Sequence, residues 1–284
     1  MVAGMVDIQL GRVGAHYFQG EVGELTELVE KIRPVVEQHG TPLQRAAFFR
    51  TLVLVNNRRD RFIVSEQTLA YSRAYLEASR ESGSLPWIAH ARFVLGFNLL
   101  WRGEFDEATE QMNTALELAV RLGRMLLQTQ CLTYLTIVYR KSGQVEEARD
   151  YALRSLEAAT SVQNPTYIGT ARANLAWVAW RKANLTEALE KGKAARESWQ
   201  QSPSSCMFQW LSLYPLTSMA LAHDRISEAV EYARGLLEPA QQALSDPLQT
   251  VLEEAIQTWE RGEPEAARTH LERAIELAQE MGYL

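Results

Sequence analysis

The stretch Gly103-Glu104-Phe105-Asp106-Glu107-Ala108 decides the fold, because its pattern returns four more times. The later copies begin at Gly143, Ala183, Asp224 and Gly262, so successive copies are 40, 40, 41 and 38 residues apart. Each copy starts with a small or turn-forming residue, has an apolar residue in third place and an alanine in sixth place. So regular a step indicates a structural repeat.

Each repeat is predicted to be a helix, a short turn and a second helix, here called the A and the B helix. Around Gly103, the A helix is expected over residues 86–102 and the B helix over 106–122. Apolar residues of this B helix recur with the 3.6-residue period of one helix face. The alanines mark places where two helices must approach closely. The apolar and small positions of that face are Ala108, Met112, Ala115, Leu116 and Ala119.

Two weaker copies lie upstream, with turns near Gly20 and over residues 60–63, so about seven antiparallel helix pairs are expected. Three capping side chains stand directly before a proline, at Thr41, Asn164 and Asp246, and predict helix starts. Neither a linker nor a break in composition interrupts the chain. The sequence therefore predicts an all-α solenoid that forms a single domain over residues 1–284.

The repeat resembles the tetratricopeptide (TPR) repeat, in the residues Leu95-Gly96, Gly103, Phe105, Ala108 and Ala115. The resemblance implies a right-handed superhelix whose A helices line the concave surface. A period near 40 is similar to the long-helix variants in C-terminal sensor regions of bacterial STAND-type signalling ATPases and transcription regulators. Because no distinctly polar capping helix is evident at either end of the array, we expect the chain to be a C-terminal fragment of a larger protein. The sequence departs from the motif where Thr136, Ala176 and Thr217 replace Gly96.

Composition and motifs narrow the classes of function. The formal net charge of −6 is the reverse of what a nucleic-acid reader usually carries. Two cysteines, no long apolar run and no leader pattern favour a reducing, cytoplasmic location without membrane contact. The sequence lacks the phosphate-binding loop, the dinucleotide fingerprint, the zinc-protease motif and the nucleophile elbow. We therefore expect no catalysis, no cofactor and no metal.

A binding surface is predicted from residues that share one face of the A helices. Phe93, Phe97 and Trp101 lie at helical spacing, and the positions one repeat later include Arg140 and Lys141. The next two repeats add the residues Trp177, Trp180, Arg181 and Tyr214. Aromatic and arginine side chains are enriched at binding hot spots. The alternative is that the aromatics pack between neighbouring A helices as core and the cations lie at solvated helix ends.

The leading hypothesis is a non-catalytic protein-interaction scaffold of a regulatory protein, which binds a partner segment or another domain of its parent in the concave groove. The first alternative is a small-molecule-sensing domain of a STAND-type regulator or cyclase, in which the aromatic residues line a ligand pocket. The second alternative is self-association through terminal repeats.

Overall fold

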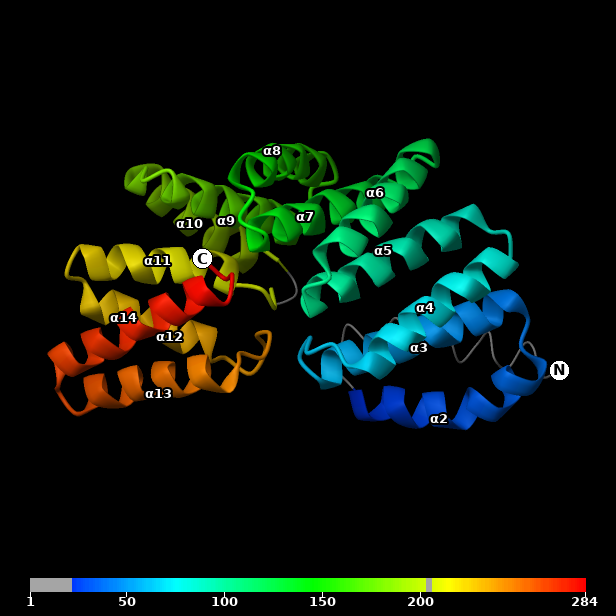
Figure 1. Ribbon diagram of the computed structural model, residues 1–284, viewed down its shortest axis with the longest axis horizontal. Helices are drawn as coiled ribbons and strands as arrows, with labels where there is room; N and C mark the ends of the chain where they lie inside the picture. Colours follow the sequence, from blue (N-terminus) through cyan, green and yellow to red (C-terminus); the bar gives the residue numbers. More distant parts are fainter. Residues whose placement is uncertain (1–21, 203–205) are drawn as a thin grey trace. The chain divides into compact units, whose positions relative to one another are not determined.

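The computed structural model describes residues 22–202 and 206–284, and every regular element among them is an α-helix (Figure 1). The all-α prediction is confirmed for these residues. In chain order the helices are α2 (Val22–His39), α3 (Pro42–Arg59), α4 (Glu66–Glu81), α5 (Leu85–Arg102), α6 (Phe105–Arg121), α7 (Met125–Lys141), α8 (Val145–Ser161), α9 (Pro165–Arg181), α10 (Leu185–Gln200), α11 (Trp210–Ala222), α12 (Ile226–Leu236), α13 (Asp246–Glu260) and α14 (Pro264–Glu280).

Successive helices pack side by side as pairs, with the odd-numbered helices from α3 onward as A helices and the even-numbered ones as B helices. The predicted boundaries around Gly103 are confirmed to within one residue by α5 and α6. The weaker copy with its turn over 60–63 is confirmed by α3 and α4. The turn expected near Gly20 lies outside the described residues.

The chain divides into two compact units, Met1–Cys131 and Leu132–Leu284. The boundary falls inside α7, so the first unit holds α2 to α6 and the second holds α8 to α14. Each unit has its own buried core. The continuity of a single domain across this boundary, and the right-handed sense of the array, stay predictions.

The turns explain why the repeat begins with a small or turn-forming residue. All five first residues have a positive φ, from 57° at Ala183 and Asp224 to 80° at Gly103. This left-handed conformation ends the A helix and turns the chain back. At Gly103 the next amide, that of Glu104, donates to the Leu99 carbonyl at 3.0 Å, which completes a Schellman motif. The chain therefore reverses within two residues and the B helix starts at once.

The repeated alanines lie where the two helices of a pair touch. Ala108, Ala148, Ala188, Ala229 and Ala267 each have no exposed surface. The partner position on the A helix of the first of these pairs is Gly96. A Cβ atom there would lie 2.7 Å from Cγ of Met112 and 3.1 Å from the carbonyl oxygen of Ala108. The small residues therefore set how closely the helices pack.

Two of the three predicted helix caps are confirmed. The Thr41 side chain accepts from the Gln44 amide while the Gln44 side chain accepts from the Thr41 amide, a complete capping box. Asn164 accepts from the amide of Tyr167. The third prediction was wrong, because the cap of α13 is Ser245 and Asp246 is already helical. There Asp246 places its negative charge in the first turn, at the positive end of the helix dipole.

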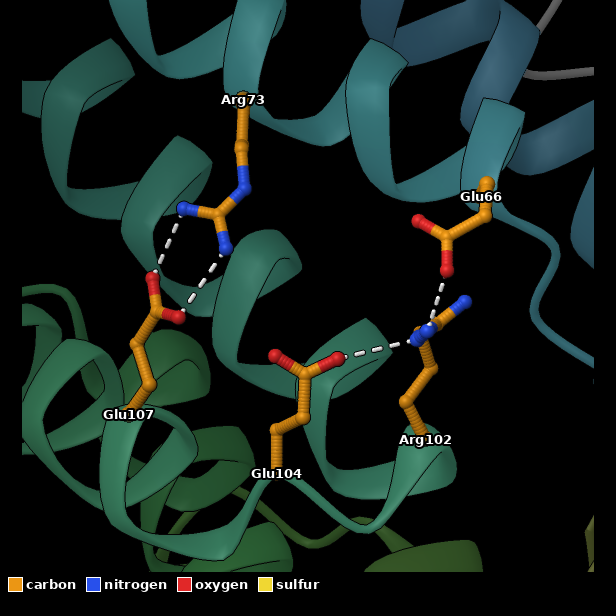
Figure 2. A network of polar contacts seen from close by, with 5 residues as sticks. All are labelled: Glu66, Arg73, Arg102, Glu104 and Glu107. Carbon is orange, nitrogen blue, oxygen red and sulfur yellow. Dashed lines mark hydrogen bonds and ion pairs between the residues drawn. The ribbon is translucent and has the colours of Figure 1, made fainter.

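Exposed ion pairs join α4 to the following helix pair in the first unit (Figure 2). Arg73 holds Glu107 with both nitrogens of its fork, at 2.9 and 3.0 Å. Arg102 bridges Glu66 at 2.5 Å and Glu104 at 2.9 Å. Exposed charges remain well solvated, so such pairs contribute little to stability. The buried small residues, and not these pairs, hold the helices together.

Candidate functional site

The predicted binding residues divide between the two units. Phe93, Phe97 and Trp101 belong to α5 in the first unit, and the other six belong to α7, α9 and α11 in the second. In the first unit the three rings are in series, with centroids 6.3 Å apart for Phe93 and Phe97 and 5.8 Å apart for Phe97 and Trp101. Phe62, which the sequence analysis missed, adds a ring 6.0 Å from Phe97. Phe93 is buried, whereas Phe97 and Trp101 are half-buried.

The ring series continues at the other end of α5 into a polar pair. His90 lies 6.1 Å from the ring of Phe93, and its Nδ1 lies 3.0 Å from the hydroxyl of Tyr75. Burial, together with the positive charges of Arg50 and Arg124, lowers the pKa of His90 to about 3. His90 is therefore neutral at pH 7, and its half-buried ring packs against Tyr75 and Phe93 in the first unit.

In the second unit, five residues form what we call the Arg140 cluster: Arg140, Lys141, Trp177, Trp210 and Tyr214. Arg140 is only 2% exposed, and it is the only charged side chain among the buried residues that the structure describes. Its guanidinium lies over two indole rings, 5.3 Å from the centroid of Trp177 and 5.1 Å from that of Trp210. Both indole faces attract the cation and shield it from water.

Pro215 accounts for the burial of this arginine. Pro215 lies inside α11 and has no amide hydrogen, so the carbonyl of Leu211, four residues earlier, lacks its helical donor. Nη1 of Arg140 donates to that carbonyl at 2.8 Å and reaches Oδ1 of Asn174 at 3.3 Å. A helix defect in α11 is thus filled by a side chain from α7, because a buried carbonyl needs a partner.

The segment Gly282–Leu284 occupies the cluster. Gly282 ends α14 with a φ of +71°, and the Tyr283 amide donates back to the Ala278 carbonyl at 2.8 Å. This turn brings the carbonyl of Tyr283 to 2.8 Å from Nη2 of Arg140. Figure 1 shows the end of the chain beside α11. The cluster therefore binds a stretch of main chain through a side-chain donor.

The ring of Tyr283 is held by aromatic and cationic neighbours. It packs edge-on against Trp210, with a centroid distance of 4.9 Å and an angle of 89°. Tyr214 lies 5.6 Å from it, and Nζ of Lys141 lies 4.4 Å from its centroid. Tyrosine at this place thus combines apolar contact with a cation–π interaction.

The remaining predicted residues border the cluster. Arg181 is exposed, and its guanidinium lies 5.3 Å from the ring of Trp177. Nε1 of Trp180 donates to the hydroxyl of Ser218 at 3.3 Å, so this tryptophan joins α9 to α11. Trp177 and Tyr214 have no exposed surface and lie in the core, as the alternative interpretation expects. Binding of a partner at any of these residues stays a prediction.

The cluster is positively charged, and within residues 22–202 and 206–284 no ion pair joins a carboxylate to Arg140 or Lys141. Burial lowers the pKa of Arg140 well below its usual value. Burial, together with the charge of Arg140, lowers the pKa of Lys141 to about 8. All the acceptors that Arg140 contacts are neutral: two main-chain carbonyls and one side-chain amide. Uncompensated positive charge of this kind favours an anionic partner.

Neighbouring polar groups fix the cluster. Oε1 of Gln242, in the connection from α12 to α13, accepts from Nε1 of Trp210 at 2.9 Å. The amide of Asn174 donates to the carbonyl of Thr170 at 3.0 Å, which orients its oxygen toward Arg140. Neither residue was predicted from the sequence, and neither were Trp210 and Tyr283. A proline inside an apolar helical run was the one available signal, because it predicts an unpaired carbonyl four residues earlier.

Residues 22–202 and 206–284 contain neither a metal-binding cluster nor a membrane-spanning helix. No group of three or more His, Cys, Asp and Glu side chains is placed to hold a metal ion there. None of the helices in these ranges combines the length and the apolar character that crossing a membrane requires.

Comparison with known proteins supports the repeat assignment. The family model described as tetratricopeptide repeat matches residues 84–161 and, overlapping them, 128–201. Residues 84–201 are tetratricopeptide repeats. A search of curated proteins finds no match.

Solved structures with tetratricopeptide-like folds match nearly the whole chain. The apo form of RapI has 16% identity and a TM-score of 0.69, over 97% of this chain and 98% of that one. NprR in complex with its cognate peptide NprX has 16% identity and a TM-score of 0.70, over 95% and 77%. A Rap protein complexed with Competence and Sporulation Factor has 14% identity and a TM-score of 0.56, over 98% and 91%. At identities this low, the structural matches show a shared fold and nothing more.

The helix pairs of the second unit accommodate their departures from the repeat motif. Thr136 and Thr217, which replace the A-helix glycine, are buried and donate to the carbonyls of Leu132 and Leu213 at 2.8 Å. The third replacement, Ala176, has no exposed surface. Each residue is small, and each threonine hydroxyl finds an acceptor on its own helix. The close packing of A and B helices is therefore kept without glycine.

Proposed function

We propose that this chain is a non-catalytic regulatory scaffold that binds a short peptide, or a segment of a partner protein, at the A-helix face of its second unit. The observation that carries the proposal is the Arg140 cluster, where Arg140 of α7 bonds to Asn174 of α9 and to the Leu211 carbonyl of α11 and donates to the main-chain carbonyl of Tyr283. A face that accepts a carbonyl and an aromatic ring from within the chain has the chemistry to accept them from another chain.

The peptide complexes among the structural neighbours support this proposal. NprR is described in complex with its cognate peptide, and a Rap protein in complex with Competence and Sporulation Factor. The fold they share with this chain makes binding of a peptide the leading reading. A STAND-type parent, a cytoplasmic location, small-molecule sensing and self-association stay predictions.

Selection from a phage-displayed library of random peptides tests the proposal. The wild-type chain is the bait, and the double variant Lys141→Glu, Arg181→Glu is the counter-bait, because Lys141 is a half-buried member of the cluster and Arg181 is an exposed neighbour of Trp177. We expect peptides that are retained by the wild type and lost by the double variant.

Arg154→Gln is the matched control, since Arg154 lies 4.7 Å over the ring of Tyr151 but belongs to the B helix α8. It should retain every selected peptide. All baits must show the same melting temperature. Enrichment of no peptide, or equal retention by the double variant, would contradict binding at this face.

A further inference from the structure

The Arg140 cluster contains more donors than its present contacts use. Nε of Arg140, Nε1 of Trp177 and the hydroxyl of Tyr214 are all buried and have no hydrogen-bond partner among the described residues. The first two groups only donate. Buried donors without acceptors are rare in folded proteins and call for an explanation. Their concentration around one guanidinium indicates that acceptor oxygens are missing from this place.

The charge of the cluster indicates which oxygens are missing. Arg140 and Lys141 bring two cations together, and burial penalises both. The oxygen that Gly282–Leu284 offers to Arg140 is the neutral carbonyl of Tyr283. Nζ of Lys141 lies 3.5 Å from the carbonyl of Gly282, at the limit of a hydrogen bond. A carboxylate would form shorter, charge-assisted bonds with both cations.

The aromatic place in the cluster is specific as well. The ring of Tyr283 fits between Trp210, Tyr214 and Lys141, with contacts of 4.4 to 5.6 Å to its centroid. The segment Gly282–Leu284 thus supplies an aromatic ring to the cluster, but it offers only neutral carbonyl oxygens to the two cations. A competing peptide would bind more tightly than this segment if it carried a negative charge beside its aromatic ring.

We propose that the ligand of the Arg140 cluster is a peptide with a carboxylate next to an aromatic side chain, and that it binds by displacing Gly282–Leu284. This inference rests on the proposed function and adds the chemistry of the peptide and the identity of its internal competitor. The aromatic side chain replaces Tyr283 between Trp210 and Tyr214. The carboxylate pairs with Arg140 and Lys141.

Two short probes that differ in one charge test the chemistry. Both carry an N-terminal fluorophore and a C-terminal amide; one is Ala-Gly-Tyr-Asp and the other is Ala-Gly-Tyr-Asn. Their affinities are measured by fluorescence anisotropy for the wild-type chain, for Tyr283→Ala, which removes the internal ring, and for Tyr283→Phe, which keeps it. We expect the aspartate probe to bind Tyr283→Ala at least tenfold more tightly than the asparagine probe does. The wild type and Tyr283→Phe should bind the aspartate probe more weakly than Tyr283→Ala.

Two further variants locate the bound charge. Lys141→Gln, in the Tyr283→Ala background, should remove most of the preference for aspartate, and Arg154→Gln should leave it unchanged. If Tyr283→Ala does not melt cooperatively, Tyr283→Leu replaces it, because leucine keeps apolar bulk but no ring. A third probe, Ala-Gly-Ala-Asp, should bind at least tenfold more weakly than the tyrosine probe.

Each contrary result overturns a defined statement. Equal affinities for the aspartate and asparagine probes would overturn the anionic ligand. Equal affinities of wild type and Tyr283→Ala would overturn displacement of the internal segment. A preference for aspartate that Arg154→Gln removes as well would overturn the location. Peptides that the library yields without acidic residues would leave the proposed function standing and overturn this inference alone.

Discussion

A left-handed backbone conformation recurs at the turn of every repeat, but glycine provides it at only three of five places. At Gly103 a Cβ atom would meet nothing within 4 Å, so the cost of a side chain there is purely conformational. At Ala183 and Asp224 the chain already bears that cost. Replacing glycine by alanine in one kind of turn, and alanine by glycine in the other, should therefore change stability in opposite directions.

Gly103→Ala is expected to lower the free energy of unfolding by about 1 kcal/mol, because alanine is disfavoured at positive φ. Ala183→Gly should raise it by several tenths of a kcal/mol or more, since relief of the left-handed alanine outweighs the greater freedom of glycine in the unfolded chain. Urea denaturation of both variants and the wild type measures these changes. A stability of Gly103→Ala equal to that of the wild type would show that residue 103 is not left-handed in solution.

His90 should make the first unit sensitive to acid. Its pKa is about 3 in the folded chain, against an ordinary value of 6.5, so the unfolded chain takes up the proton first as the pH falls. The contribution of this neutral histidine is complete above pH 6.5. It is lost between pH 6.5 and 3, by at most about 1.4 kcal/mol per pH unit.

His90→Gln, which keeps a polar group near Tyr75, removes this titration. The difference in unfolding free energy between wild type and His90→Gln, followed from pH 7 to 4, isolates the effect from the carboxylates that both proteins share. We expect the difference to shift steadily in favour of the variant as the pH falls. A difference that does not change with pH would contradict the buried, neutral histidine.

The sequence predicted which residues share a helix face, but not which of them are buried. Trp177 and Tyr214 lie on the expected face and have no exposed surface, whereas Arg181 on the same face is exposed. Helical spacing cannot separate these cases, because burial depends on what neighbouring helices and the segment 282–284 cover. Contacts between residues 143 positions apart, such as that of Arg140 with Tyr283, leave no periodic signal.

The helix pair is the element that repeats, and its small buried alanines make it sensitive to added volume. Ala108→Leu and Ala148→Leu should each lower stability by about 1–3 kcal/mol through overpacking. Both side chains have no exposed surface. Glu117→Leu, on the exposed face of the same helix as Ala108, is the control and should change stability by less than about 0.5 kcal/mol. Unchanged melting of both alanine variants would reject the register of the pairs.

The pairing of Pro215 with Arg140 predicts a non-additive result. Arg140→Met leaves the carbonyl of Leu211 without a donor, at a cost of about 1–3 kcal/mol. Pro215→Ala restores an amide at the helical position. We therefore expect Arg140→Met to be less destabilising in the Pro215→Ala background, by about 1 kcal/mol.

A double-mutant cycle of denaturation curves measures that coupling. Lys141→Met in the same two backgrounds is the control, because its ammonium group contacts Gly282 and two rings and not Leu211. It should show no coupling to Pro215. Strict additivity of Arg140→Met and Pro215→Ala would mean that the guanidinium does not serve the orphaned carbonyl.

The helices and their pairing were predictable because three signals mark the same helix–turn–helix unit in each repeat: the apolar period, the turn residue and the alanine. A second series of turns was also readable and was missed. Gly83, Gly123 and Gln163 are 40 residues apart, fall midway between the first series, and have positive φ. These residues lie in the turns that separate one helix pair from the next. Gln163 adopts the left-handed conformation although it is not a glycine. The interior proline of α11 was missed because a periodic search treats it as one more apolar residue.

At the scale of the whole molecule, the two units should respond separately to loss of the internal segment. Tyr283→Ala removes ring contacts within the second unit only. We expect a destabilisation of about 2 kcal/mol, less than the 3–5 kcal/mol of a fully buried aromatic residue, because Tyr283 is half-buried. Hydrogen exchange should quicken in α9 and α11 and stay unchanged in α3 and α4.

Tyr283→Phe should match the wild type in the same experiment, because it keeps the ring between Trp210 and Tyr214. Faster exchange in α3 and α4 of the Tyr283→Ala variant would mean that the two units unfold together. The chain would then unfold as one cooperative unit, although its contacts divide it near residue 131.

The bond from Arg140 to Tyr283 also fixes an order of events during synthesis. Most packing joins helices that are neighbours in the chain, and such contacts form as soon as each pair is made. Arg140 must wait for a carbonyl 143 residues later. At ordinary translation rates of about 5–20 residues per second, that wait is roughly 7–30 s. Leu211 follows Arg140 by 71 residues, so in the second half of that wait the nascent second unit carries a guanidinium bonded to α11 but still open on its other side. A peptide present in the cell would arrive there before the chain's own tyrosine.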